Sequence, residues 1–333
     1  MLPPGHITMD AFSIDSEGRW YIAGSSDVDN VPFLWRVSST LDSYEVLAEG
    51  DKFIDIQVSL DGSAVFAVTA KSAIRSYDTA LKNKYDLIET EDTSFSWSGV
   101  AYDDSTGILF ATASKKNAVY QYTQGDGHWS TRALVAGNPS GEALDTADGL
   151  NNPTVLRWYD GYLFIRVFDG VWQWKPFDSA ATQTFGGIYV YGQRGLTVSP
   201  DNFVYYSKTN NKVYRKPISN PPDGPGDIFA GACGCGPESN QLCNSLESNL
   251  VTFTPSGQVI IQDYPELYGN PEDLSFRLVS WSPHKLSIPP CYGSSTTSGP
   301  ATGTTTTSGP VTSSSTTTSG PVTSTTTTSG PVT

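Results

Sequence analysis

Short apolar runs alternate with polar turns along most of the chain. One example is the run at residues 54–59, which is followed by Asp61-Gly62, a second run at 64–68 and a third at 73–77. Runs of five or six residues that are rich in aromatic and β-branched side chains predict strands. Glycine, asparagine or aspartate between them suits a tight hairpin, because these residues tolerate positive φ. Helical periodicity is nearly absent, so the pattern predicts an all-β chain.

Six such turns divide the upstream part of the chain into units of similar length. The last residues of successive turns fall 44, 45, 54, 41 and 55 positions apart. A period of about 40–55 residues made of strands alone is typical of the blades of a β-propeller. The turns are Ser16-Glu17-Gly18, Asp61-Gly62, Ser105-Thr106-Gly107, Asp160-Gly161, Asp201-Asn202 and Ser256-Gly257.

The predicted architecture is a six-bladed β-propeller over residues 1–291, followed by an extended Thr/Ser/Pro-rich tail over residues 292–333. The blades are expected at about 5–50, 51–95, 96–150, 151–192, 193–247 and 248–288.

The tail has the composition of a sugar-bearing stalk. Residues 294–333 include 27 serines or threonines among 40 residues, and Ser-Gly-Pro recurs every ten or eleven residues. Such a segment offers too little apolar area to form a core, and it resembles mucin stalks and the glycoprotein repeats of algal and protist surfaces. The expected O-glycosylation sites are Thr296, Thr297, Thr304, Thr305, Thr306, Thr307, Thr316, Thr317, Thr318, Thr325, Thr326, Thr327 and Thr328, and the candidate hydroxyprolines are Pro300, Pro310, Pro321 and Pro331.

The charge of the chain excludes some classes of partner. The formal net charge is −14, and Lys285 is the last charged residue. An acidic chain is a poor ligand for nucleic acid or anionic membranes, and no apolar run is long enough to span a bilayer. The beginning of the chain lacks the pattern of a signal peptide, so a mature or truncated start is expected.

Four cysteines lie in the last third of the predicted propeller: Cys233, Cys235, Cys243 and Cys291. An even number in an extracellular chain favours disulfides. The favoured scheme joins Cys233 or Cys235 to Cys243 and the other to Cys291. A zinc site is the competing interpretation, but no histidine lies near and the spacing fits no common zinc finger.

Two connections between the predicted blades carry a family resemblance. Residues 136–153 read AGNPSGEALDTADGLNNP, and Phe229-Ala230-Gly231 opens a weaker second copy. This resembles the inter-blade segment of NHL-repeat β-propellers. The resemblance implies a six-bladed propeller over roughly residues 5–285. It implies no activity, since such propellers serve as platforms, scaffolds and occasionally enzymes.

No catalytic residue, metal ligand or cofactor is expected. Three histidines, His6, His128 and His284, are too few and too scattered for the zinc centre of propeller lyases. Lactonase-like propellers instead place Glu, Asn and Asp around a divalent ion. The corresponding channel-side candidates in this sequence have no diagnostic spacing, and they are Asp10, Asp55, Asn151 and Asn152.

Tryptophans form the densest aromatic cluster, around Trp158, Trp172 and Trp174. Strand alternation places Trp172 and Trp174 on one face. Packing between blades is the favoured interpretation, and a surface that stacks on sugars is the alternative.

The sequence therefore favours a structural extracellular glycoprotein, a subunit of a glycan-coated surface fibril that associates with itself. A secreted carbohydrate-active enzyme with a linker to a binding module, and a soluble lectin-like module, remain as alternatives.

Overall fold

The computed structural model describes residues 7–26, 30–88, 94–125, 128–144, 146, 149–168, 170–178, 182–185, 195–208, 212–218, 226–231, 251–263 and 277–281. The chain divides into two units, Met1–Cys291 and Tyr292–Thr333. All described residues belong to the first unit. The four cysteines and the predicted glycosylation and hydroxyproline sites lie outside the described residues, so those predictions stand untested.

Five antiparallel sheets have four strands each, and in every one the strand order follows the chain. The first is β1 (Ile7–Ile14), β2 (Trp20–Ser26), β3 (Pro32–Val37) and β4 (Tyr44–Glu49). The second is β5 (Phe53–Val58), β6 (Ala64–Thr69), β7 (Ile74–Asp78) and β8 (Lys84–Ile88). The third is β9 (Trp97–Asp103), β10 (Ile108–Ala113), β11 (Ala118–Gly125) and β12 (His128–Gly137), with the 3-10 turn η1 (Ser114–Lys116) before β11.

The later sheets repeat this plan. The fourth is β13 (Val155–Tyr159), β14 (Tyr162–Val167), β15 (Gly170–Trp174) and β16 (Thr182–Phe185). The fifth is β17 (Leu196–Val198), β18 (Phe203–Lys208), β19 (Lys212–Pro217) and β20 (Asp227–Ala230). The sixth sheet has three strands among the described residues: β21 (Val251–Phe253), β22 (Val259–Asp263) and β23 (Arg277–Trp281).

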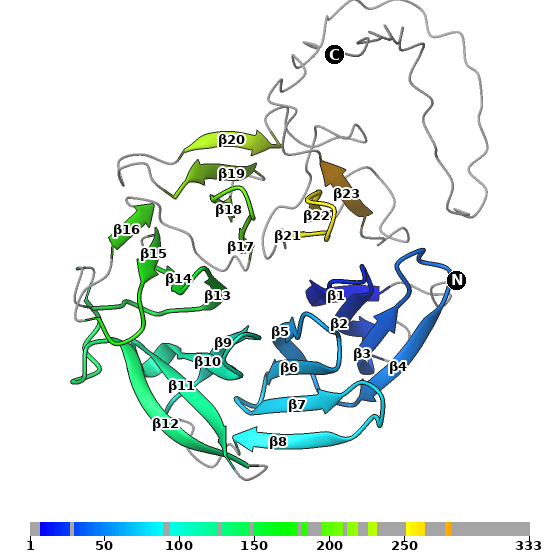
Figure 1. Ribbon diagram of the computed structural model, residues 1–333, viewed down its shortest axis with the longest axis horizontal. Coiled ribbons are helices and arrows are strands. Elements are labelled where there is room, and N and C mark those ends of the chain that lie inside the picture. Colours follow the sequence, from blue (N-terminus) through cyan, green and yellow to red (C-terminus); the bar gives the residue numbers. More distant parts are fainter. Residues whose placement is uncertain are drawn as a thin grey trace, which may run out of the picture. The chain divides into compact units, whose positions relative to one another are not determined.

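The sheets are arranged in a ring with their first strands innermost (Figure 1). Each first strand contacts the next, from β1 and β5 through β9, β13 and β17 to β21, and β21 contacts β1. The fold is therefore a β-propeller. It contains five four-stranded blades where the sequence predicted six, and the sheet β21–β23 follows them around the ring.

All six predicted turns connect a first strand to a second strand. Their last residues, Gly18, Gly62, Gly107, Gly161, Asn202 and Gly257, have φ between 63° and 80°. Only glycine and asparagine adopt this conformation readily, which is why the turns are visible in the sequence. A hydroxyl at the start of the turn adds support at Ser59 and Ser199, where Oγ accepts a hydrogen bond from the backbone N–H of Ala64 (3.0 Å) and Phe203 (3.1 Å).

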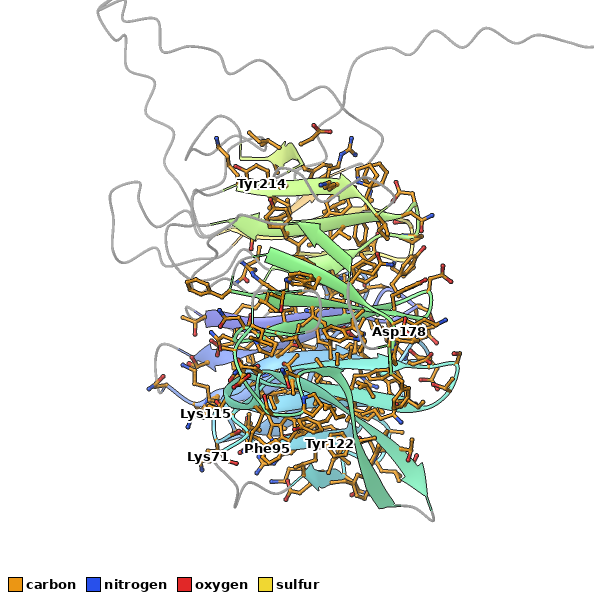
Figure 2. The ribbon with its side chains drawn as sticks, turned by 90° about the vertical axis from the view of Figure 1, so that its left-hand side faces the viewer. Lys71, Phe95, Lys115, Tyr122, Asp178 and Tyr214 are labelled. Atoms are coloured by element: carbon orange, nitrogen blue, oxygen red, sulfur yellow. The ribbon has the colours of Figure 1, made fainter. Side chains whose placement is uncertain are left out.

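The hydrophobic core lies between neighbouring sheets rather than at the centre of the ring. Phe66 and Val68 of the second sheet pack with Phe95, Trp97 and Tyr122, which belong to the third sheet or precede it. Phe95 and Tyr122 are labelled in Figure 2, and they belong to one cluster of buried side chains with Phe66 and Val68. Packing at these layers positions each first strand, and hence the side chains that face the channel.

Hydrogen bonds between turns link consecutive blades. The backbone N–H of Ser16 donates to the carbonyl oxygen of Leu60 (2.9 Å), and the N–H of Leu60 donates to Asp104 Oδ1 (2.7 Å). Further round, the Tyr159 hydroxyl donates to the carbonyl oxygen of Pro200 (3.1 Å).

Candidate functional site

The channel is lined by residues at one equivalent place in the first strands. Each first strand ends at, or one residue before, one of Asp15, Ser59, Asp103, Tyr159, Ser199 and Thr254, and the residues two positions earlier are Ser13, Gln57, Ala101, Arg157, Thr197 and Thr252. Five of these six are polar, and all five line a cavity of about 160 Å³. Phe12, Ile14, Ile56, Trp158 and Val198 complete its lining.

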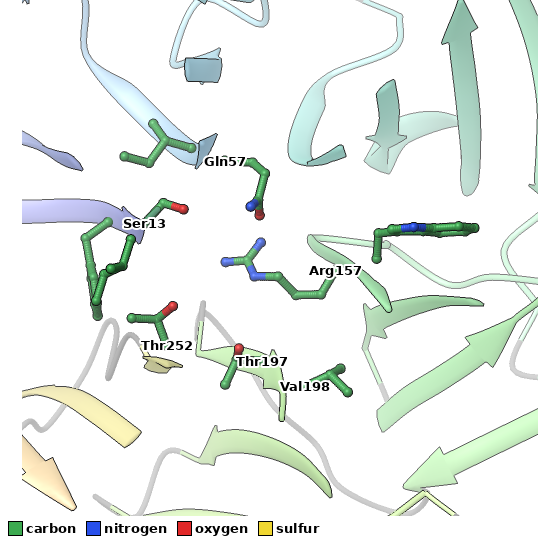
Figure 3. A pocket seen from close by; sticks show the side chains of 10 residues that line it. Ser13, Gln57, Arg157, Thr197, Val198 and Thr252 are labelled. Atoms are coloured by element: carbon green, nitrogen blue, oxygen red, sulfur yellow. The ribbon is translucent and has the colours of Figure 1, made fainter. Parts of the chain in front are cut away.

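Arg157 is the charged side chain of this cavity. It reaches from β13 into the space framed by Ser13, Gln57 and Thr252 (Figure 3). Of the described residues that line the cavity, none is a carboxylate, so the paired carboxylates of a glycosidase are not found in this lining.

Asp55, one of the four channel-side candidates, pairs with Arg157. Its Oδ2 lies 3.3 Å from Arg157 Nη1 and also accepts the backbone N–H of Val100 at 3.0 Å. A register shift in the β5–β6 pairing between Phe53 and Asp55 marks a β-bulge. Bulges redirect a side chain, and here Asp55 links strands of three blades, β5, β9 and β13.

The contacts of Arg157 use only part of its donor set. Nη1 donates to both oxygens of Asp55 and to the Leu156 carbonyl oxygen (2.7 Å), while Nη2 donates to Asp55 Oδ1 (3.4 Å). A guanidinium has five N–H groups. Among the described residues no acceptor takes Nε–H or the second N–H of Nη2. These two groups form the edge of the guanidinium that binds a carboxylate through two parallel hydrogen bonds.

Hydroxyls surround the guanidinium. Ser13 Oγ accepts the backbone N–H of Val58 (3.2 Å), which leaves its own hydrogen available to donate. The hydroxyls of Thr197 and Thr252 make no hydrogen bond to any described residue. Gln57 donates through Nε2 to the Val58 carbonyl oxygen (3.1 Å), so its amide oxygen can face the cavity.

Exposed acidic residues occupy the turns at the ends of the first strands. Although the Asp104 side chain is exposed, partial desolvation of its carboxyl group and the nearby carboxylates of Asp61 and Asp103 raise its pKa. The carboxylates of these turns add negative charge just beyond the first strands, and Asp160 follows Arg157 by three positions in the chain. The exposed acidic residues are Glu17, Asp61, Asp104, Asp160 and Asp201.

The other channel-side candidates lie away from the cavity. Asp10 falls at a bulge of β1, between Met9 and Ala11. The backbone N–H of Asn152 donates to Asn117 Oδ1 (2.9 Å), and the carbonyl oxygen of Asn151 accepts from the N–H of Phe168 (2.9 Å). Both asparagines therefore support the connection that leads to β13.

The sugar-stacking hypothesis fails for two of the three tryptophans. Trp172 and Trp174 are 6% and 1% exposed and pack in the layer between the third and fourth sheets. A ring enclosed by protein has no face to offer a sugar, so packing between blades accounts for both residues. Trp158 is half-buried, stacks on Phe110 with 5.0 Å between ring centroids, and borders the cavity.

Within the described part of the chain, no group of three His, Cys, Asp or Glu residues could hold a metal ion. No described helix is long and apolar enough to cross a membrane. His128 begins β12, and His6 and His284 fall outside the described residues.

Comparison with known proteins supports the fold. No family model matches the chain, and no curated protein matches it. A chain of the nidogen/laminin complex is 16% identical, with a TM-score of 0.51 over 64% of this chain and 77% of that one. A protein of unknown function from Bacteroides thetaiotaomicron VPI-5482 is 14% identical, with a TM-score of 0.54 over 78% of this chain and 68% of that one. U3-55K is 12% identical, with a TM-score of 0.50 over 83% and 82%. Likenesses at these identities establish the β-propeller and nothing about activity.

Proposed function

We propose that the chain is a structural extracellular glycoprotein, a subunit of a glycan-coated surface fibril. In this proposal the propeller is the platform for assembly and residues 292–333 are the O-glycosylated stalk. The supporting observation for the stalk is its composition, because 27 of the 40 residues at 294–333 are serine or threonine and none carries a charge. Dense glycosylation stiffens such a chain toward extended conformations.

Exposed apolar side chains in two outer strands and in the turns before them support the role of the propeller as a platform. Nine large apolar side chains are exposed among the described residues, and five of them belong to the first two sheets near their outer edge. An ion pair between Glu45 and Lys82 (2.7 Å) brings the outer parts of these sheets together. Contiguous exposed apolar surface commonly marks a protein interface. The outer apolar patch consists of Leu41, Tyr44, Val46, Leu81 and Tyr85.

The proposal includes a ring of six blades of the NHL-repeat type, with β21–β23 as the sixth. Support comes from the contact of β21 with both β17 and β1. Ile260 of β22 also packs with Met9, Phe12 and Trp20 of the first sheet.

Glycopeptide mapping of residues 292–333 on protein isolated from its native source tests the stalk. Sugars on most of the threonines named above are expected. An unmodified tail on a monomeric protein would remove the proposal.

Sedimentation of the glycoprotein and of its variants measures assembly and so tests whether the propeller is the assembly platform. Tyr44→Ser combined with Leu81→Ser is expected to shift assemblies toward monomer. Phe177→Ser is the matched control, because Phe177 is 64% exposed, similar to Leu81 at 67%, and lies outside the patch. Equal assembly by all three proteins would contradict the assigned surface.

A further inference from the structure

We propose that the channel cavity binds a small carboxylate monoanion through the Nε–Nη2 edge of Arg157. This site is independent of the fibril hypothesis, since it rests on the channel residues alone.

The shape of the donor set indicates a carboxylate. Asp55 occupies the Nη1–Nη2 edge of the guanidinium, and the Leu156 carbonyl oxygen takes a further N–H of Nη1. The remaining edge presents two parallel N–H groups to the cavity, a spacing that matches the two oxygens of a carboxylate. A lysine at this place would offer charge without this geometry.

Three hydroxyls complete the site. Ser13, Thr197 and Thr252 come from β1, β17 and β21, and each can donate to a carboxylate oxygen. Ser13 and Thr197 are buried, at 6% and 7% exposed. Donors fixed by three separate strands are ordered before a ligand arrives, which lowers the entropic cost of binding.

Charge favours a monoanion over a dianion. Arg157 supplies one positive charge, and Asp55 already offsets it at 3.3 Å. The acidic turns Glu17, Asp61, Asp104, Asp160 and Asp201 add repulsion that grows with the charge of the ligand. Sulfate and phosphate dianions are therefore expected to bind more weakly than acetate.

Size limits what can be enclosed. The cavity holds about 160 Å³, close to the roughly 150 Å³ of an engineered cavity that accommodates benzene. A ligand of about six non-hydrogen atoms fits entirely, as acetate or lactate would. A uronic acid sugar is larger and would place only its carboxylate and adjacent carbons inside. The carboxylate can thus come from a free small acid or from an acidic sugar.

Isothermal titration of the full chain with sodium acetate, at constant ionic strength, tests the site. Arg157→Gln is expected to weaken acetate binding by about tenfold or more, because it removes a charge-assisted two-point contact. Arg157→Lys, which keeps the charge, is expected to lose most of the affinity as well. Arg36→Gln is the matched control, since Arg36 pairs with Glu45 at the outer part of the first sheet.

Asp55→Asn provides a test in the opposite direction. It removes the negative charge beside Arg157 and keeps an oxygen for the Val100 N–H, so acetate binding is expected to strengthen severalfold. Asp42→Asn, in the exposed β3–β4 turn, changes the net charge equally and is expected to have no effect.

Three results would overturn the proposal: no acetate binding by either the native chain or Asp55→Asn, equal binding by folded Arg157→Gln, or equal responses to Asp55→Asn and Asp42→Asn. Tighter binding of sulfate than of acetate would overturn the choice of a monoanion. Sodium glucuronate distinguishes the two sources. Tighter binding than acetate supports an acidic sugar, and weaker binding supports a free small acid.

Discussion

Gln262 donates a hydrogen bond from Nε2 to the backbone carbonyl oxygen of Met9, 3.1 Å away, and joins residues 253 positions apart in the chain. Gln262 lies on β22 and Met9 on β1, so the bond crosses from the last described sheet to the first. Both residues are buried. In this place a side-chain amide links the two ends of the ring.

Replacing Gln262 by alanine is expected to lower the free energy of unfolding by about 1–3 kcal/mol. The substitution removes a buried donor and leaves a gap between the two sheets. Urea denaturation followed by tryptophan fluorescence measures the change. Gln124→Ala, at an exposed position of β11, is the control and is expected to stay within about 0.5 kcal/mol of the native chain. Equal stability of the two variants would contradict a role for Gln262 in joining the sheets.

Tyr21 is expected to make stability fall at alkaline pH. Burial, with the nearby Asp15 carboxylate, raises the pKa of Tyr21 to about 12. The folded-state pKa lies above the ordinary value of about 10, so the neutral Tyr21 side chain contributes to the free energy of unfolding. This contribution is fully present below pH 10 and is lost as the pH rises through 12.

Urea denaturation of Tyr21→Phe along a pH series checks this expectation. Near neutral pH the variant should be less stable by about 1 kcal/mol, because it loses the hydroxyl that bonds Asp15 and Gly62. Between pH 10 and 12 this deficit should shrink or reverse. Tyr85→Phe, at a half-exposed position, should parallel the native chain throughout.

Gly62→Ala is expected to cost more than the same change at another turn. Both Gly62 and Gly161 have positive φ, at 69° and 79°. A Cβ on Gly62 would lie 2.3 Å from Arg19 Nη2 and 2.4 Å from Asp15 Oδ2, whereas a Cβ on Gly161 would meet nothing within 4 Å.

Gly161→Ala should therefore lower the free energy of unfolding by only about 1–2 kcal/mol, which is the cost of a Cβ on a residue with positive φ. Gly62→Ala should lower it by more, because the added Cβ also disrupts the contacts of Gly62 with Arg19 and Asp15 of the first blade. Chemical denaturation of both variants gives the comparison, and equal losses would show that the close approach at Gly62 has no energetic weight.

Trp172→Ala is expected to lower the free energy of unfolding, and it is not expected to abolish sugar binding by the folded protein. Truncating a buried tryptophan costs about 3–5 kcal/mol. Thermal unfolding together with a glycan array on the folded fraction separates the two effects. Selective loss of glycan binding at unchanged melting temperature would restore the stacking hypothesis for this residue.

The turns were the most predictable part of the fold, and the reason is local. The positive φ at positions 62 and 202 favours glycine or asparagine, so a single residue in the sequence indicates the backbone geometry of each turn. Gly50 has a φ of 86°, close to the 97° and 80° of Gly137 and Gly231, and it ends the outer strand of the first sheet in the same way. It follows the last strand of the first blade, and its similarity to Gly137 and Gly231 was not used in dividing the sequence into blades.

The channel site was only partly predictable. Asp55 was a candidate, but its pairing with Arg157 depends on how blades separated by 102 residues meet. Arg157 lies four residues before Gly161, whereas Ser13 and Thr197 lie five residues before Gly18 and Asn202, so aligning the turns alone would not have placed Arg157 in register with them. Strand alternation correctly put Trp172 and Trp174 on the same face. Whether that face met solvent or another sheet was decided by blade packing, which local sequence does not encode.

The chain order of the strands within each four-stranded blade has a consequence for circular permutation. No strand of these five sheets is borrowed from another part of the chain. If the ends of the ring were joined by a linker and the chain were opened between β8 and β9, every strand of these five sheets would keep its hydrogen-bonded neighbours within one continuous segment. Such permutants should assemble the same ring from a different starting blade, with the blades themselves as the interchangeable units.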